Sequence, residues 1–240
     1  MDYKLYYWRI PFRGNFIRLI LEDANQKYIE SSPEEIINIK TMPVGKQVLP
    51  AMAPPFLHDL RNDVFLSQMP SIVMYLSQKL GYHLVEDPYR SAVCLKLILD
   101  SNDVLAEITN LNGTMMWDHE TWKLFRTKRL RKWFEIFEET GKKFGLRENK
   151  GYMLSSMDIS TADLIVYALF GMMTQCLPDL KGDFEQHAPY LFSLCKRVGE
   201  RPNIQKFIKE QTRKYGQLYC GGQIERSIRK MLDLDSKSFN

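Results

Sequence analysis

The stretch of residues 53–76 limits the possible folds of this chain more than any other. It begins near Pro54-Pro55, and because proline has no backbone N–H to donate, this pair excludes a regular central strand at that point. Short apolar runs on either side of a polar segment follow within residues 56–66, which predicts a β-hairpin. Pro70 suits the first turn of a helix, and apolar residues at helical spacing come after it. The sequence therefore predicts a hairpin that leads into a helix.

The start of that helix is the first candidate binding site. The first turn of a helix leaves backbone N–H groups without partners, and the helix dipole adds partial positive charge there. Such an end binds a carboxylate or a phosphate. We therefore expect an anion-binding helix end beside the Pro54-Pro55 bend.

Composition indicates a globular protein of one large or two small domains. The 240 residues are 45% hydrophobic and 26% charged, and the net charge of +4 allows a nucleic-acid partner without arguing for one. The four cysteines show no C-x-x-C spacing, which fits a reducing compartment. No apolar signal core and no membrane-spanning run is found, so we expect a cytoplasmic protein that binds neither nucleic acid nor membrane. His58, His83, His119 and His187 are scattered, and no metal site is predicted.

The first 81 residues predict a small mixed α/β domain. An aromatic strand at residues 4–8 is followed by a loop and by a helix at residues 15–24. A short strand at 28–30 and a short helix at 34–39 precede the hairpin and its helix. The expected order is β-α-β-α-β-β-α.

Beyond a linker at residues 81–89 the strand signals vanish, and residues 89–215 predict an all-helical domain. The expected helices span residues 90–111, 120–144, 157–173, 189–198 and 202–211. The helix at 157–173 is almost wholly apolar, so it should be buried on all sides, and Ser160 to Asp163 form a capping-box pattern at its start. Residues 216–240 are interpreted as a C-terminal tail. The fold class is α/β plus all-α.

Four segments, in this order, resemble those of the cytosolic glutathione transferases of the tyrosine type (mu, pi and sigma). They are residues 4–21, Pro55 at the position of the family's cis-proline, the run Ser67 to Leu76, and the capping box at Ser160. The resemblance covers about the first 210 residues. It implies a thioredoxin-like domain that binds glutathione, a helical domain that shapes a pocket for an electrophile, and a homodimer that acts in detoxification.

The resemblance also implies roles for individual residues. Tyr7 occupies the position of the tyrosine whose hydroxyl donates to the glutathione sulfur, and Arg13 matches an arginine near the active site, so both are predicted to be catalytic. The residues predicted to bind glutathione are Tyr7, Trp8, Lys40, Pro54, Gln68, Met69 and Asp103. Lys46 is the alternative to Lys40 for the glycyl carboxylate, and Asp103 would reach the glutathione of the partner subunit. Glutathione is the expected co-substrate.

Two positions depart from the family pattern. Met69 stands where the family has a serine, so a hydroxyl contact to the glutathione carboxylate is lost and only a backbone N–H is left. Pro54 has no N–H for the cysteinyl carbonyl. Each loss corresponds to about 0.5–1.5 kcal/mol. These departures favour a second hypothesis, in which the chain is a non-catalytic ligand-binding or assembly module.

Other interpretations are open from the residues alone. Tyr7 in an aromatic strand could be a core residue, and Asp103 could be a solvated carboxylate. Met115-Met116-Trp117 could line an apolar pocket or merely pack. Thiol–disulfide chemistry is disfavoured because the loop at residues 9–13 contains no cysteine. The enzymatic hypothesis covers thioether formation and peroxide reduction by the same thiolate.

Overall fold

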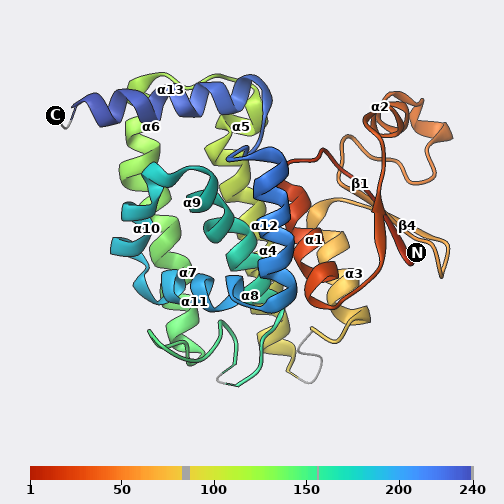
Figure 1. The fold of residues 1–240 in the computed structure, drawn as a ribbon, viewed down its shortest axis with the longest axis horizontal. Coiled ribbons are helices and arrows are strands. Elements are labelled where there is room, and N and C mark those ends of the chain that lie inside the picture. Colours follow the sequence, from red (N-terminus) through yellow and green to blue (C-terminus); the bar gives the residue numbers. More distant parts are fainter. Residues whose placement is uncertain (83–86, 156, 239–240) are drawn as a thin grey trace.

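The structure is a computed structural model that describes residues 1–82, 87–155 and 157–238. The first part contains β1 (Tyr3–Tyr6), α1 (Phe12–Asp23), β2 (Tyr28–Glu30), α2 (Pro33–Thr41), the short 3-10 turn η1 (Val44–Lys46), β3 (Phe56–Asp59), β4 (Val64–Ser67) and α3 (Met69–Lys79). The predicted order β-α-β-α-β-β-α is confirmed. Figure 1 shows the sheet and α2 on one side of the molecule and the helical part on the other.

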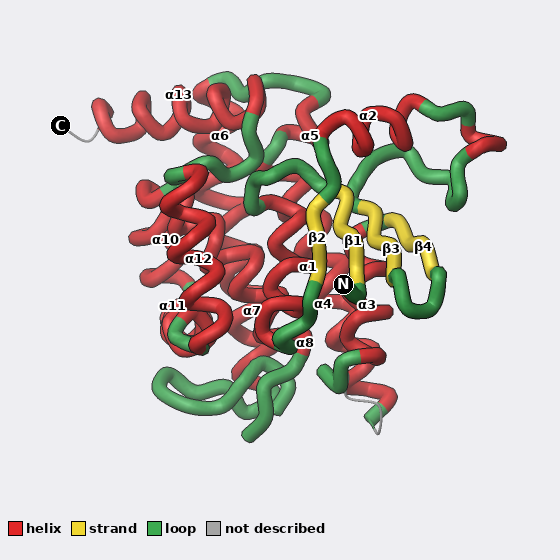
Figure 2. Tube along the Cα trace, turned by 45° about the vertical axis from the view of Figure 1, so that its right-hand side comes forward, coloured by secondary structure: helices red, strands yellow, loops and turns green. Residues whose placement is uncertain are grey.

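The four strands form one mixed sheet in the order β2-β1-β3-β4. β1 runs parallel to β2, with Tyr3 opposite Tyr28, and antiparallel to β3, with Leu5 opposite Leu57. Side chains alternate between the two faces of a strand, so Leu5 is buried while Tyr6 lies on the opposite face. α1 and α3 pack together between the sheet and the helical part, and Figure 2 shows the sheet (yellow) in front of them. The side chain of the residue after β1, Tyr7, therefore belongs to the buried face.

The second part is helical, as predicted. It contains α4 (Pro88–Ile108), α5 (Asn110–Gly113), α6 (His119–Leu124), the π-helical η2 (Phe125–Leu130), α7 (Arg131–Lys143), α8 (Thr161–Val166), the π-helical η3 (Tyr167–Gly171), α9 (Met172–Cys176), η4 (Pro178–Leu180), α10 (Lys181–His187), α11 (Pro189–Gly199), α12 (Pro202–Tyr215) and α13 (Gly222–Ser238). The segment α6-η2-α7 corresponds to the helix predicted at 120–144. The linker predicted at 81–89 leads into α4, and its residues 83–86, with His83, lie outside the described residues.

The apolar helix of this part starts at Thr161, later than the predicted residue 157, because the capping box sets its first turn. The Asp163 carboxylate accepts from the Ser160 backbone N–H at 2.8 Å and from the Met153 N–H at 2.7 Å. All residues of α8 are buried, as expected. The assignment of Ser160 and Asp163 to structure is confirmed.

The two parts share one core and are joined by polar contacts between distant residues. The side-chain amides of Asn15 and Gln211 exchange two hydrogen bonds at 2.8 and 3.0 Å, and both residues are buried. The Arg201 guanidinium donates to both carboxylate oxygens of Asp23 at 2.6 and 2.8 Å. These contacts hold α1 rigidly against α12, and thereby hold the loop that precedes α1.

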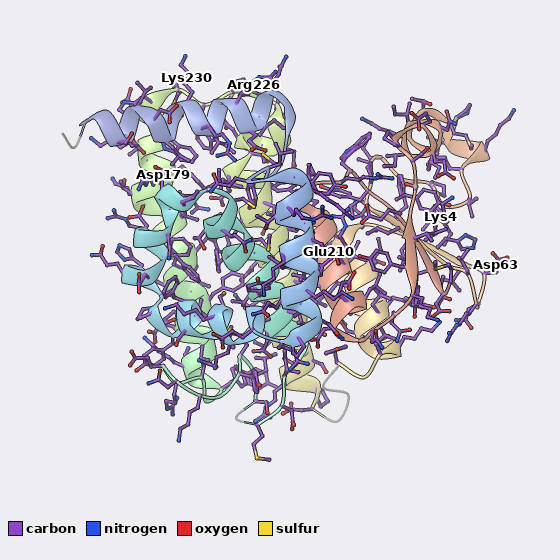
Figure 3. All side chains as sticks on the ribbon, in the orientation of Figure 1. Lys4, Asp63, Asp179, Glu210, Arg226 and Lys230 are labelled. Carbon is purple, nitrogen blue, oxygen red and sulfur yellow. The ribbon has the colours of Figure 1, made fainter. Side chains whose placement is uncertain are left out.

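Most of the segment interpreted as a tail is helical in the structure. It forms α13, a helix of 17 residues that lies across the top of the helical part in Figure 1. Ile228 and Leu232 are buried, whereas Arg226 and Lys230 point outward in Figure 3. Since this amphipathic spacing is a helix signal, the interpretation as a tail overlooked it. No helix in the described part of the chain is long and apolar enough to cross a membrane.

Candidate functional site

The loop between β1 and α1 positions Tyr7, and a buried arginine holds this loop. The Arg18 guanidinium donates to the backbone carbonyls of Trp8 at 2.8 Å and Ile10 at 2.7 Å, and it pairs with the Glu30 carboxylate at 2.6 Å. Arg18 is 1% exposed, so these bonds satisfy a charge that would be costly to bury alone. The backbone on either side of the loop is therefore fixed.

Gly14, in the first turn of α1, makes room for the Tyr7 ring. A Cβ atom at Gly14 would lie 2.5 Å from Tyr7 Cδ1 and 2.4 Å from Arg18 Nη1. Neither neighbour can move freely, because both are buried. The ring of Tyr7 thus packs directly on the backbone of α1, with the Arg18 guanidinium carbon 5.9 Å from its centroid.

The phenol of Tyr7 remains protonated over the physiological range. Burial raises the pKa of Tyr7 to about 12, although the charges of Arg13 and Arg18 and the Arg13 backbone N–H act in the opposite direction. A protonated phenol is a hydrogen-bond donor, and a donor stabilises an anion such as a thiolate. Tyr7 is buried, as expected for a core residue. Its surroundings nevertheless include two cations, Arg13 and Arg18.

Arg13 is held by two asparagines of the helical part. Its Nε donates to Asn102 Oδ1 at 3.1 Å, and its Nη2 donates to Asn112 Oδ1 at 2.8 Å. Asn112 has φ +57°, and its neighbours Asn110, Leu111 and Gly113 also have positive φ. Three of these four residues have a Cβ atom, so this left-handed run is strained, and such strain is concentrated at functional sites. Arg13, in the first turn of α1, thereby links α1 to α4 and α5.

The start of α3 and the proline bend lie side by side, as the sequence predicts. The peptide bond Pro54-Pro55 is cis, and Phe56 pairs with Ser67 across the hairpin, so Pro55 comes next to Gln68. Gln68 is exposed and has φ +71°, a costly backbone conformation for a residue with a Cβ atom. The side chain of Met69 is fully buried in the core, so only its backbone N–H can face a ligand.

The remaining predicted residues are on the surface or half-buried. Trp8 is half-buried, whereas Lys40 and Lys46 are exposed at the end of α2 and in η1. Lys46 lines a cavity of about 430 Å³ on the outer face of the sheet, together with Tyr6 and others. Asp103 is exposed on α4, and its neighbour Asn102, rather than Asp103, contacts Arg13. The structure thus brings Tyr7 and Arg13 together but not Asp103.

The segment that leads into α13 lies close to the Tyr7 and Arg13 side chains, and the sequence analysis did not predict this. Tyr219 is 1% exposed, and its ring packs edge-on against Phe12 at 5.4 Å. Burial raises the pKa of Tyr219 well above its usual value, and Arg13 and Tyr7 both act on it. Its hydroxyl has no hydrogen-bond partner in the described part of the chain. No local pattern identifies Tyr219, because its role depends on where α13 docks.

The carboxylate of Glu225 stabilises the turn that precedes α13. Glu225 Oε2 accepts hydrogen bonds from three successive backbone N–H groups, those of Tyr219 at 2.9 Å, Cys220 at 3.1 Å and Gly221 at 2.6 Å. This fixes Tyr219 over Phe12.

The segment Met115-Met116-Trp117 does not form a single pocket wall. Trp117 packs against Trp122 and Phe125, while Met115 and Met116 are exposed.

No group of three or more His, Cys, Asp or Glu residues able to hold a metal ion is found within residues 1–82, 87–155 and 157–238. The site described above is instead a phenol, a guanidinium and a free helix end, which suits an anionic or nucleophilic organic ligand.

Comparisons with known proteins agree with this arrangement. A family model described as the C-terminal domain of glutathione S-transferase matches residues 93–231. No match is found among curated proteins. The Pi-class glutathione S-transferase of Onchocerca volvulus has a similar structure, with a TM-score of 0.72 and 19% identity over 92% of this chain and 98% of that chain.

Two further structures share the fold. The glutathione S-transferase of Ascaris lumbricoides has a TM-score of 0.66 and 25% identity over 88% of this chain and 98% of that chain. The prostaglandin synthase D of Nilaparvata lugens has a TM-score of 0.67 and 19% identity over 88% of this chain and 98% of that chain. These similarities confirm a thioredoxin-like part followed by a helical domain. Because the family model covers more than half of its residues, the chain belongs to the glutathione S-transferase family.

Proposed function

We propose that the protein binds glutathione and transfers its thiolate to small apolar electrophiles. The observation that carries this proposal is the Tyr7 phenol, which is held protonated with a pKa of about 12 beside the Arg13 guanidinium. A free thiol has a pKa of about 8.5, so it needs a donor and a nearby cation to ionise at neutral pH. Tyr7 would supply the donor and Arg13 the cation.

In the proposed reaction the thiolate sulfur attacks the electrophilic carbon and forms a thioether. With an aryl halide, the halide leaves with the electron pair of the broken bond. The same thiolate would reduce a hydroperoxide by attacking its outer oxygen: the O–O bond breaks, the alkoxide leaves and takes up a proton as the alcohol, and the sulfur becomes a sulfenic acid. A second glutathione thiol would then condense with this sulfenic acid, giving the disulfide and water. In both cases the Tyr7 hydroxyl donates a hydrogen bond to the sulfur. The proton stays on the phenol oxygen, because the phenol is a weaker acid than the thiol.

Binding of the tripeptide is assigned to the proline bend and the start of α3. The γ-glutamyl carboxylate would accept from the backbone N–H of Met69 and from the side chain of Gln68, which is exposed there. The carbonyl of Pro54 would accept from the cysteinyl N–H. Lys40 or Lys46, which are both exposed, would meet the glycyl carboxylate, and Trp8 would contact the tripeptide beside Tyr7.

We further propose a homodimer, in the cytoplasm, in which Asp103 reaches the glutathione of the partner subunit. Asp103 is exposed and forms no hydrogen bond or ion pair within the described part of the chain. Leu95 and Leu99, on the same helix, are 39% and 47% exposed. Their side chains form an apolar surface that a partner subunit would cover. Light scattering of the purified protein tests this: a mass of one chain would contradict it.

A second candidate function is ligand binding without turnover. Tyr219 covers Phe12 beside Tyr7, and the side chain of Met69 offers no donor. Both features reduce access to the phenol or the strength of glutathione binding. In this case the fold would serve as a ligand-binding or assembly module.

Retention on immobilised glutathione, followed by an assay with 1-chloro-2,4-dinitrobenzene, distinguishes the two. Retention together with thioether formation supports the enzyme. Retention with no thioether formation and no reduction of a hydroperoxide would leave only the binding module. Failure of the protein to bind glutathione at all would contradict the enzyme and leave the module with a different ligand.

A further inference from the structure

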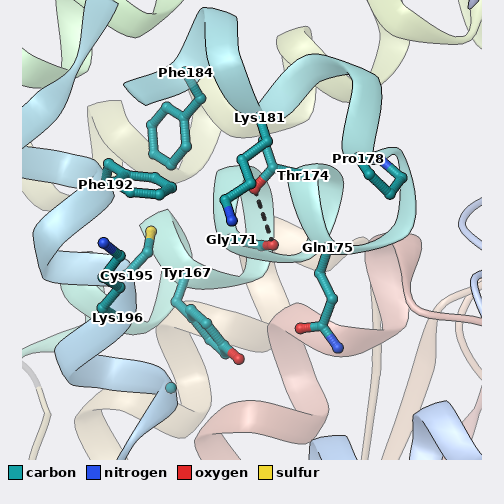
Figure 4. A pocket seen from close by; sticks show the side chains of 11 residues that line it. Tyr167, Gly171, Thr174, Gln175, Pro178, Lys181, Phe184, Phe192, Cys195 and Lys196 are labelled. Atoms are coloured by element: carbon teal, nitrogen blue, oxygen red, sulfur yellow. Dashed lines mark hydrogen bonds between the residues drawn. The ribbon is translucent and has the colours of Figure 1, made fainter. Parts of the chain in front are cut away.

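A small, charged cavity lies where the helical segment α6-η2-α7 meets α10 and α13, on the side of the helical part that faces away from the sheet (Figure 1). Its volume of about 290 Å³ is just below the range of sites for drug-sized ligands, so it suits a small ion or group. It differs from the cavity in Figure 4, whose lining includes the aromatic rings of Tyr167, Phe184 and Phe192. The lining of the small cavity instead carries three cations and two carboxylates.

The three cations come from one continuous helical segment. Lys123, Arg126 and Arg131 follow one another at intervals of three and five residues, and all three line the cavity. Like charges on one face of a helix repel each other, so this face needs anions nearby. The middle of the segment, η2, is π-helical, and this conformation is frequent at functional sites.

Two carboxylates from distant parts of the chain supply part of that compensation. Arg126 Nε donates to Asp183 Oδ2 at 2.8 Å, and its Nη1 donates to Asp235 Oδ2 at 2.8 Å. Asp183 Oδ1 accepts from Arg131 Nη2 at 3.1 Å. The two arginines therefore balance the two carboxylates, and they join α10 and α13 to the same helical face.

Asp235 has two further partners. Its Oδ2 also accepts from Trp122 Nε1 at 3.0 Å, and its Oδ1 lies 3.3 Å from His119 Nε2. All four carboxylate oxygens of Asp183 and Asp235 thus have nitrogen partners, and none of these partners is Lys123.

The positive charge of Lys123 is not compensated. Its ammonium group forms no hydrogen bond or salt bridge with the described residues, although Glu120 lies three residues before it. Arg131 has unused donors: within the described residues its only hydrogen bond is to Asp183, and its buried Nε has no partner. A guanidinium with unused donors at a cavity indicates that an anion or water completes its bonding. Three cations against two carboxylates leave one positive charge in excess.

We propose that this cavity binds a phosphate group, either the free ion or the phosphoryl group of a small monoester, between the Lys123 ammonium and the Arg131 guanidinium. A guanidinium presents paired N–H donors that match phosphate oxygens, and the ammonium adds a point charge. The carboxylates in the same lining are already balanced by the two arginines. The site shares no lining residue with the β1–α1 loop, so it does not depend on the proposed transfer reaction.

The test is a titration of the full-length protein with inorganic phosphate, followed by line broadening in phosphorus NMR. Sodium chloride keeps the ionic strength constant in a phosphate-free buffer, so a general salt effect is excluded. Lys123→Gln is expected to weaken phosphate binding about fivefold, as for one partly exposed ion pair. Lys123→Arg keeps the charge and is expected to bind as the unmodified protein does. Both variants keep the fold, because Lys123 is exposed and its ammonium group has no partner among the described residues.

The matched control is Lys128→Gln, which removes an exposed charge of η2 that does not line the cavity. A second control is Lys196→Gln, at the cavity shown in Figure 4. Both are expected to bind phosphate as the unmodified protein does. The proposal is overturned if the protein does not bind phosphate, if Lys123→Gln keeps full affinity, or if Lys128→Gln loses as much.

Two competitors identify the form of the ligand and the place where it binds. Displacement of inorganic phosphate by phenyl phosphate would assign the cavity to monoesters, and a lack of displacement would assign it to the free ion. Saturating glutathione is expected to leave phosphate binding unchanged. Displacement by glutathione would place the phosphate at the Tyr7 site and would overturn the proposal.

Discussion

Arg13 Nη2 donates a hydrogen bond of 2.8 Å to Asn112 Oδ1, across 99 positions of the sequence. The bond joins the first turn of α1 to the left-handed turn of α5. It orients the guanidinium whose charge acts on Tyr7. The strained turn at Asn112 is therefore part of the proposed active site, although it lies in the other half of the protein.

The variant Asn112→Gly tests the role of this bond. Glycine accepts the φ of +57° without strain, so the change removes the side chain and leaves the turn intact. Since Arg13 loses one of its two hydrogen bonds to asparagines and keeps the one to Asn102, we expect turnover with the aryl halide to fall about three- to tenfold. Asn110→Gly, with φ +46° in the same turn and no bond to Arg13, is the control. Equal turnover in the two variants would exclude Asn112 from the mechanism.

Tyr7→Phe is expected to lower turnover by roughly ten- to a hundredfold with little effect on glutathione affinity. The loss corresponds to one hydrogen bond to a charged group, about 1.5–3 kcal/mol. Tyr6→Phe is the matched control, because its ring lies on the opposite face of the sheet. The measurement is kcat at saturating glutathione, together with the pH dependence of glutathione thiolate absorbance. A Tyr7→Phe enzyme as fast as the unmodified protein would remove the phenol from the reaction.

Gly14→Ala is expected to displace the Tyr7 ring. Its Cβ atom would come within 2.5 Å of Tyr7 Cδ1, and the buried Arg18 blocks the other side. Such overpacking costs about 1–3 kcal/mol of unfolding free energy, and turnover should fall with it. Gly182→Ala, in α10 with no atom within 4 Å of the new Cβ, is expected to be neutral or to stabilise by up to about 1 kcal/mol. Urea unfolding of both variants measures this.

Asp59 gives a prediction about pH. Burial alone would raise the pKa of its carboxyl, but hydrogen bonds from Lys79, Tyr75 and Asn62 outweigh burial and hold the pKa well below its usual range. A lowered pKa adds stability above the unfolded-state pKa of about 4, and this stability is lost as the pH falls below it. Asp59→Asn should therefore reduce the unfolding free energy by about 2 kcal/mol at pH 7.

The difference between Asp59→Asn and the unmodified protein should shrink as the pH falls from about 4 toward 2. Asp63→Asn, whose side chain is 94% exposed in the same hairpin, is the control and should show little change at any pH. Urea unfolding at several pH values provides the measurement. A difference that stays constant down to pH 2 would mean that the Asp59 carboxylate is not stabilised by its neighbours.

Tyr219→Phe is expected to stabilise the protein by about 1 kcal/mol. The Tyr219 hydroxyl is buried without a partner in the described part of the chain, so removing it removes a desolvation cost. Tyr75→Phe, which deletes a hydroxyl that donates to Asp59 at 2.5 Å, is expected to destabilise instead. Thermal unfolding of both variants decides the point, and a less stable Tyr219→Phe would contradict it.

Several elements could be predicted because their signals are local. Pro54-Pro55 and Pro70 define where a strand cannot run and where α3 can begin, and Ser160 to Asp163 define the start of α8. The predicted adjacency of the proline bend and the α3 start also follows from the hairpin register. By contrast α13 was overlooked, although Ile228 and Leu232 have helical spacing, because the polar residues around them suggested a tail.

The sequence by itself determined the order of strands and helices and the proline bend beside the start of α3. These depend on periodicity, on missing proline N–H groups and on short-range capping, which act over a few residues. The sequence placed Tyr7 inside a strand at residues 4–8, whereas β1 ends at Tyr6. Only the tertiary structure decided that Asn112 holds Arg13 and that Tyr219 packs on Phe12. The reason is physical: these contacts join residues brought together by packing of the whole core, and such packing leaves no periodic pattern in the chain.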